Sequence, residues 1–151
     1  MSERYIKPGW FDNHLMVPTI RGLTRMGLSV WGSRLLRVRG RTSGEPRSTP
    51  VNVLTFRGRR YLVSPRGQTH WVRNIRASGG SAELLLGGRS EPIRAVEITD
   101  EGQKIQVVRE YLRRWKFEVG QFFSGMGADS PESELKRIAP DHPVFLIQSS
   151  P

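Results

Sequence analysis

The 151-residue chain contains no cysteine, so disulfide bonds, thiolate metal sites and cysteine nucleophiles are all excluded. It also has no apolar run that approaches the length needed to span a membrane. Its first residues, MSERYIKPGWFDN, are polar and are interrupted by Pro8 and Gly9, so we expect no signal peptide. Together these absences predict a cytoplasmic protein.

Signatures of metal or hydrolytic catalysis are missing as well. The three histidines, His14, His70 and His142, are far apart and show neither HExxH nor paired spacing, so we expect no metal site. There is no G-x-S-x-G sequence, and the acidic residues do not cluster into a carboxylate pair. No residue type and spacing identifies a catalytic residue. Solvent, or a hydroxyl such as that of Tyr111 or Ser124, could supply a proton.

Positive charge is abundant, and it is confined to one segment. Residues 34–76 hold eleven arginines and one acidic residue, Glu45, which gives a net charge of +10, equal to that of the whole chain. The remaining residues balance, with thirteen Lys and Arg against thirteen Asp and Glu. A charge so confined favours a local anionic ligand. The pI near 11.1 also suits nucleic acid, but the aromatic residues lie mostly outside the basic segment, so we expect no nucleic-acid partner.

Short apolar stretches separated by turns predict a mainly β, α+β fold. We expect strands at 34–40, 47–56, 60–65, 81–87, 90–98 and 143–149, and helices at 69–78, at 101–119 and from about 130. Residues 1–12 are expected to form an extended arm. Residues 15–26 are expected to form a short helix that caps the core or touches a membrane surface. Six strands with few helices between them favour an antiparallel barrel with peripheral helices, formed by one domain, 1–151.

Two glycine turns in the basic segment have features of an anion site. In the first, GRTSGEPR at 40–47, glycines let the backbone bend around two hydroxyl side chains, and arginines flank the turn. Taken alone, this turn is explained equally well as an exposed hairpin with solubilising arginines. In the second, SPRGQT at 64–69, a strand ends and a helix begins, and the free amides at a helix N-terminus attract anions.

The two turns together resemble a known family. The stretch GRTSGEPRSTPV at 40–51 is similar to the G-R-K/T-S-G-x-P-R-x-x-P-L motif of the deazaflavin-dependent nitroreductase family. The later stretches YLVSPRG at 61–67 and WVRNI at 71–75 look like that family's glycine loop followed by W-Y-x-N-L. Order and spacing agree from about residue 35 to residue 98. The chain departs from the pattern at Thr42, where the family often has Lys, and at Val72, which replaces the common Tyr.

This resemblance implies a six-to-seven-stranded antiparallel split β-barrel that binds the deazaflavin coenzyme F-420. In such proteins the barrel groove holds the tricyclic ring, and cationic loops hold the phosphodiester and glutamyl tail. The positions that match the motifs imply a cofactor site formed by Arg41, Thr42, Ser43, Gly44, Arg47, Ser64, Pro65, Arg66, Gly67, Trp71 and Asn74. The first five would contact the phosphate or tail, the next four would lie along the cofactor, and the last two would shape its pocket.

The resemblance further implies an oxidoreductase that passes hydride from the reduced cofactor to an electron-poor acceptor such as a quinone, an enone or a nitro compound. Trp115, Phe122 and Phe123 are the expected substrate-pocket residues, because they occupy the part of the chain where the family has tyrosines. FMN as the cofactor, or a lipid or small-molecule carrier without turnover, are the alternatives. We expect a monomer or homodimer, with peripheral membrane contact as an option through residues 15–26.

Overall fold

A computed structural model describes residues 33–119, 123 and 126–150, and for 116–119 it describes the backbone only. The expected arm at 1–12, the expected helix at 15–26, Phe122 and Ser124 lie outside the described residues. The elements are β1 (Ser33–Arg39), β2 (Pro46–Phe56), β3 (Arg59–Val63), α2 (His70–Ala77), β4 (Ser81–Leu86), β5 (Arg89–Glu97), α3 (Glu101–Val119), α4 (Glu132–Ile138), the 3-10 helix η3 (Ala139–Asp141) and β6 (Val144–Ser149).

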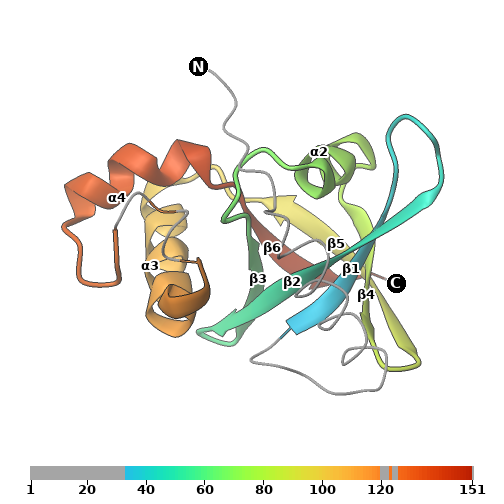
Figure 1. Cartoon of the computed structure of the whole chain (residues 1–151), viewed down its shortest axis with the longest axis horizontal. Coiled ribbons are helices and arrows are strands. Elements are labelled where there is room, and N and C mark those ends of the chain that lie inside the picture. The colour runs from blue at the N-terminus through green and yellow to red at the C-terminus, as the bar shows by residue number, and fades with distance from the viewer. Residues whose placement is uncertain (1–32, 120–122, 124–125, 151) are drawn as a thin grey trace.

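The six strands form a closed antiparallel barrel in the order β1-β2-β3-β6-β5-β4, with β4 returning to pair with β1 (Figure 1). All six expected strands are present, and their ends differ from the expected ones by at most two residues. The predicted fold class, mainly β with an antiparallel barrel and peripheral helices, is therefore confirmed. The hairpins β1–β2, β2–β3 and β4–β5 join neighbouring strands, which is the connectivity that short turns between alternating apolar strands predict.

Successive side chains of a strand point to opposite faces, and in β3 and β6 both faces are covered. Leu62 of β3 belongs to the cluster inside the barrel, together with Val72 and Ile75 of α2, which covers one end of the barrel. The neighbouring Tyr61 belongs to a second cluster, between the outside of β3 and β6 and the helices α3 and α4 (Figure 1). The helix predicted for 101–119 therefore packs against the barrel from outside.

Two backbone details differ from the expected pattern. The helix expected at 101–119 has the expected bounds, but Trp115 within it has non-helical angles (φ −125°, ψ 27°), which marks a kink. In the β2–β3 turn, Arg57 adopts a positive φ of 52°, which is unusual for a residue with a side chain. Its guanidinium lies 4.9 Å from the centre of the Phe56 ring and donates to Gln106 of α3, so packing compensates the strained backbone.

Candidate functional site

The loop between β1 and β2 is tightly closed by its own backbone. The amide of Gly40 donates to the carbonyl of Glu45 at 2.7 Å, and the amide of Gly44 donates back to the carbonyl of Gly40 at 2.9 Å. Gly44 has φ +74°, in the left-handed region that favours glycine. The hydroxyl of Ser43 accepts a bond from the amide of Glu45, and both it and Thr42 are exposed at the tip. The loop predicted to bind an anion is thus a turn closed by its own hydrogen bonds, and it presents two hydroxyl groups to solvent.

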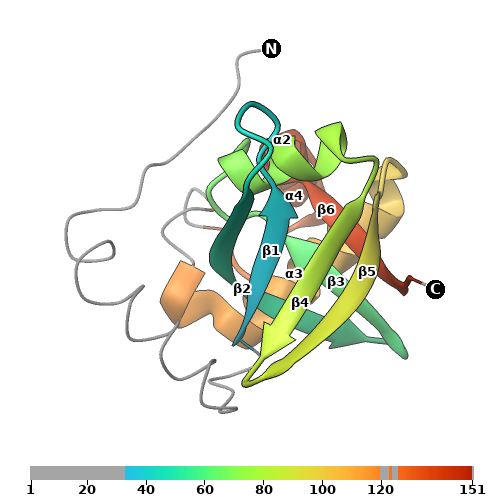
Figure 2. The same cartoon turned by 90° about the vertical axis from the view of Figure 1, so that its right-hand side faces the viewer.

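This loop is attached to α2. The side-chain oxygen of Asn74 accepts a hydrogen bond from the backbone amide of Arg41 at 3.1 Å and another from its guanidinium at 2.8 Å. A second guanidinium nitrogen lies 3.4 Å from Nδ1 of His70. The two views of the fold show the β1–β2 loop beside α2 at one end of the barrel (Figure 2). The predicted loop at 40–47 therefore lies against the helix that follows the second predicted turn, 64–69.

The second loop, at 64–69, is stabilised by hydrogen bonds between its own residues. The Ser64 hydroxyl is fully buried and donates to the carbonyl of Gly67 at 2.5 Å, while the Ser64 carbonyl lies 3.1 Å from Nδ1 of His142. The amide of Thr69 also donates to the carbonyl of Gly67, at 2.9 Å. Ser64 therefore closes the turn through its hydroxyl, and the partly exposed Pro65 and Arg66 are the members of this loop that reach the surface.

The N-terminus of α2 carries a buried hydroxyl that has no partner. Thr69 is the N-cap residue of the helix expected at 69–78, and its side chain makes no capping bond. The residue is 7% exposed, and its Oγ1 has no hydrogen-bond partner within the described part of the chain. A buried polar atom of this kind is costly unless something bonds it. Next to it, Trp71 is half-buried, with its ring 5.8 Å from that of Phe145, so one ring face packs on the barrel core.

The positive charge of 34–76 is divided in the fold. Three of its arginines are paired with carboxylates of β4 and β5: Arg37 with Glu83, Arg60 with Glu91 and Arg76 with Glu97. Ser90 and Arg37 lower the pKa of the Glu83 carboxyl, and the two-pronged bond from Arg60 lowers that of Glu91. The β2–β3 turn also places Arg57 and Arg59 at the opposite end of the barrel from α2. The eleven arginines of this segment therefore do not all lie at one end of the barrel.

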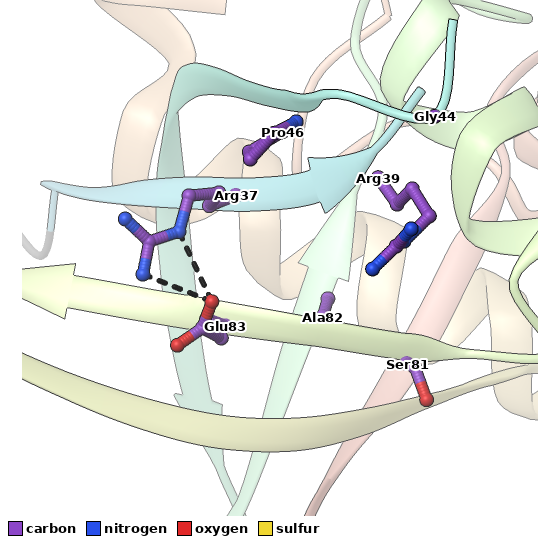
Figure 3. Close-up of a pocket in the computed structure, with 7 residues that line it drawn as sticks. All are labelled: Arg37, Arg39, Gly44, Pro46, Ser81, Ala82 and Glu83. Carbon is purple, nitrogen blue, oxygen red and sulfur yellow. Dashed lines mark hydrogen bonds and ion pairs between the residues drawn. The ribbon is translucent and has the colours of Figure 1, made fainter. Parts of the chain in front are cut away.

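Within the described residues, Arg39 and Arg47 have no carboxylate partner, and both side chains are exposed. Arg39 borders a shallow pocket of about 220 Å³ on the outer face of β1 and β4 (Figure 3). The pocket is lined by Arg37, Arg39, Gly44, Pro46, Ser81, Ala82 and Glu83. Sequence reasoning did not select Arg39 or Ser81, because nothing in the sequence shows that β4 lies beside β1.

Two of the three expected substrate-pocket residues, Trp115 and Phe123, lie within the described part of the chain, and both are in its core. Trp115 is 1% exposed and Phe123 fully buried, and both rings pack around Tyr111 in the cluster under α3. Phe123 also stacks on His142, with ring centres 4.0 Å apart. The structure therefore does not bring Trp115 or Phe123 to the cationic loops directly. Tyr111, one of the two hydroxyls considered as a proton source, is buried as well.

The described residues include no group of three His, Asp or Glu side chains that could hold a metal ion. None of the helices in the described part of the chain is both long enough and apolar enough to cross a bilayer. Lys104, at the start of α3, is more than half buried, and this burial lowers the pKa of its amine despite the opposing effect of the nearby Glu97. It lies outside the loops that carry the predicted site.

Comparison with known proteins identifies one family whose model matches most of the chain. The model of the F420H(2)-dependent quinone reductase family matches residues 15–121 of the chain. Among curated proteins, none matches its sequence.

Solved structures share the fold. A structure titled as an F420-H2 dependent reductase (FDR-A) superposes with a TM-score of 0.53 at 18% identity, over 78% of this chain and 94% of that one. A domain-swapped dimer gives 0.56 at 16% identity, over 87% of this chain and 94% of that one. A protein of unknown function from Agrobacterium tumefaciens gives 0.56 at 16% identity, over 97% of this chain and 58% of that one.

Proposed function

Since the chain belongs to the F420H(2)-dependent quinone reductase family, we propose that it passes a hydride from reduced coenzyme F-420 to a quinone. The family makes the protein an oxidoreductase and coenzyme F-420 its cofactor. The quinone, the residues that hold the cofactor and a cytoplasmic location are our proposals.

The residues around the β1–β2 loop suit an anionic cofactor. Arg39 and Arg47 have no carboxylate partner among the described residues, and Arg41 is held by a neutral amide. All three keep their charge for a ligand, and guanidinium groups suit phosphate and carboxylate oxygens. The unpartnered Thr69 hydroxyl at the N-terminus of α2 is a further group that a bound ligand would satisfy. On these grounds the site fits the group that the family implies.

The observation that carries the proposal is that the first cationic loop is bonded, through Arg41 and Asn74, to the helix that follows the second cationic turn. In the proposed site, Arg41 and Arg47 bind the phosphate or tail, with Thr42, Ser43 and Gly44 at the loop tip. Pro65, Arg66 and Gly67 lie along the cofactor, Ser64 closes their turn, and the half-buried Trp71 borders the ring. When bound, the reduced cofactor supplies the hydride, and with one proton the quinone becomes a hydroquinone.

The acceptor class can be tested by turnover. Under anaerobic conditions, the protein loaded with reduced F-420 should oxidise it in the presence of menadione, followed by the return of the oxidised cofactor's absorbance. An enone and a nitroaromatic of similar size serve as competing acceptors, and Arg59→Gln, at the far end of the barrel, serves as the matched control for Arg47→Gln. Faster turnover of the enone or the nitro compound would overturn the quinone assignment while leaving the cofactor assignment intact.

A further inference from the structure

We infer that Asn74 is a positioning residue: it holds Arg41 in the geometry that binds the anionic part of the cofactor, and it does not neutralise the charge of the arginine. This inference rests on the proposed function only in taking Arg41 as a cofactor ligand. The motif resemblance predicts that Asn74 shapes the cofactor pocket itself, whereas the contacts indicate that it acts through another residue.

The geometry of the pair is specific. Asn74 is 4% exposed and lies on α2, which is fixed to the barrel by the Arg76–Glu97 ion pair and by the burial of Val72 and Ile75. Its side-chain oxygen accepts two bonds from Arg41, one from the backbone and one from the guanidinium. An amide oxygen has two lone pairs, so both are used. Because its oxygen is saturated, Asn74 offers no further acceptor to a ligand.

The two bonds fix different degrees of freedom in an exposed loop. The bond to the backbone amide fixes the loop at residue 41 against α2, and the bond to the guanidinium fixes the long side chain. An untethered arginine would lose rotamer freedom on binding a ligand. With the tether in place, much of that loss has already occurred on folding. Arg41 still has several N–H donors that Asn74 does not engage.

The neutrality of the acceptor matters as much as the tether. Arg37, Arg60 and Arg76 are each held by a glutamate, which balances their charge. Arg41 is instead held by an amide, so its charge is not balanced by its partner. This difference distinguishes an arginine that is placed to attract an anion from arginines that hold strands and helices together.

Two substitutions at one position separate the tether from the charge. Asn74→Leu removes both bonds, and Asn74→Asp keeps the shape and both bonds but adds a balancing carboxylate. We expect each to raise the Kd for oxidised F-420, measured by fluorescence titration, by about 3–10-fold. Arg41→Gln should raise it by about 10-fold or more. For Asn74→Asp, the dependence of Kd on salt should also weaken, because one effective cation is lost.

A double-mutant cycle decides the mechanism. If Asn74 acts through Arg41, then Asn74→Leu combined with Arg41→Gln should bind F-420 within about twofold of Arg41→Gln alone. Multiplied effects, or an Asn74→Asp protein that binds like the wild type, would overturn the inference. If Asn74→Leu fails to fold by circular dichroism, the Asn74→Asp result decides. If Arg41→Gln itself binds F-420 like the wild type, then Arg41 is not a cofactor ligand. That result would refute the proposed cofactor site, and the role inferred for Asn74 would be refuted as well.

Discussion

Arg60 and Glu91 form a two-pronged ion pair at one end of the barrel, with N–O distances of 2.9 and 2.5 Å. Their strands, β3 and β5, are separated by β6, so the pair reaches past a neighbouring strand. Arg60 pairs in register with Ile147 and Glu91 with Leu84, and both of these face the barrel interior. Since directly paired residues share a face, Arg60 and Glu91 project into the mouth of the barrel opposite α2.

This pair predicts how stability depends on pH. Arg60 lowers the pKa of the Glu91 carboxyl in the folded state. The stabilisation is therefore complete above the unfolded pKa, about 4.3, and is lost as the pH falls through the lower folded pKa. Glu91→Gln should lower the free energy of unfolding at pH 7 by about 1 kcal/mol or less, because the pair is partly exposed. Urea unfolding at a series of pH values should show that the difference between the two proteins narrows as the pH falls below about 4.3. A difference that stays constant down to the lowest pH at which both proteins fold would contradict the electrostatic account.

Arg47→Ala tests the cationic loop. We expect it to weaken F-420 binding by about 1.5–3 kcal/mol through loss of a charge-assisted contact. Arg59→Ala is the matched control, because Arg59 is equally exposed and lies in the turn at the other end of the barrel. Arg109 would be a poor control, since its guanidinium bonds the carbonyls of Ala128 and Ser130. Equal losses for Arg47 and Arg59 would indicate a diffuse field and refute the site.

Thr69→Val tests the unpartnered hydroxyl. Replacing a buried hydroxyl without a partner by a methyl group of similar shape should leave the free energy of unfolding unchanged or raise it. If that hydroxyl bonds the cofactor, the same change should weaken F-420 binding by about 1 kcal/mol. Thermal melting and fluorescence titration of the same preparations separate the two effects. Unchanged affinity would remove Thr69 from the site.

Gly80→Ala tests how α2 is joined to the sheet. Gly80 has φ +94°, and a Cβ there would lie 2.5 Å from the carbonyl oxygen of Ala95 on β5. Because the added Cβ would clash with backbone atoms of a strand, which cannot move without disturbing the sheet, we expect a loss of about 2–4 kcal/mol in the free energy of unfolding. Gly88→Ala, in the β4–β5 turn, meets nothing within 4 Å and should be nearly neutral. Equal stability of the two variants in urea would show that the close approach is not rigid.

The parts of this fold that sequence could predict are those determined locally. Alternating strands, the glycine loop at 40–44 and the Thr69 helix start follow from short stretches of chain, and each is found close to its expected place. Contacts between distant residues could not be predicted in the same way. The Arg41–Asn74 bond joins residues 33 apart, and the Arg37–Glu83 pair depends on the closure of the barrel by β1 and β4.

The burial of the expected substrate-pocket residues could not be predicted from sequence either. Aromatic residues at 115 and 123 are expected at a cavity because of their type and place in the chain, but their burial depends on contacts between distant parts of the chain. In the structure Trp115 and Phe123 are buried against Tyr111, and a role for them at a substrate stays a prediction. The sequence could suggest a cationic site because charge and glycine spacing are visible in it. It could not show which of eleven arginines are already balanced.

Hydrogen–deuterium exchange of the backbone, with and without F-420, tests the central claim most directly because it needs no substitution. The account predicts slower exchange on binding at 40–47 and at 64–76, which hold the first loop, the second turn and the part of α2 to which Arg41 is bonded through Asn74. The hairpin turns at 57–60 and 87–91, at the other end of the barrel, should exchange at unchanged rates. Protection of those hairpins, with 40–47 and 64–76 unaffected, would contradict the proposed site.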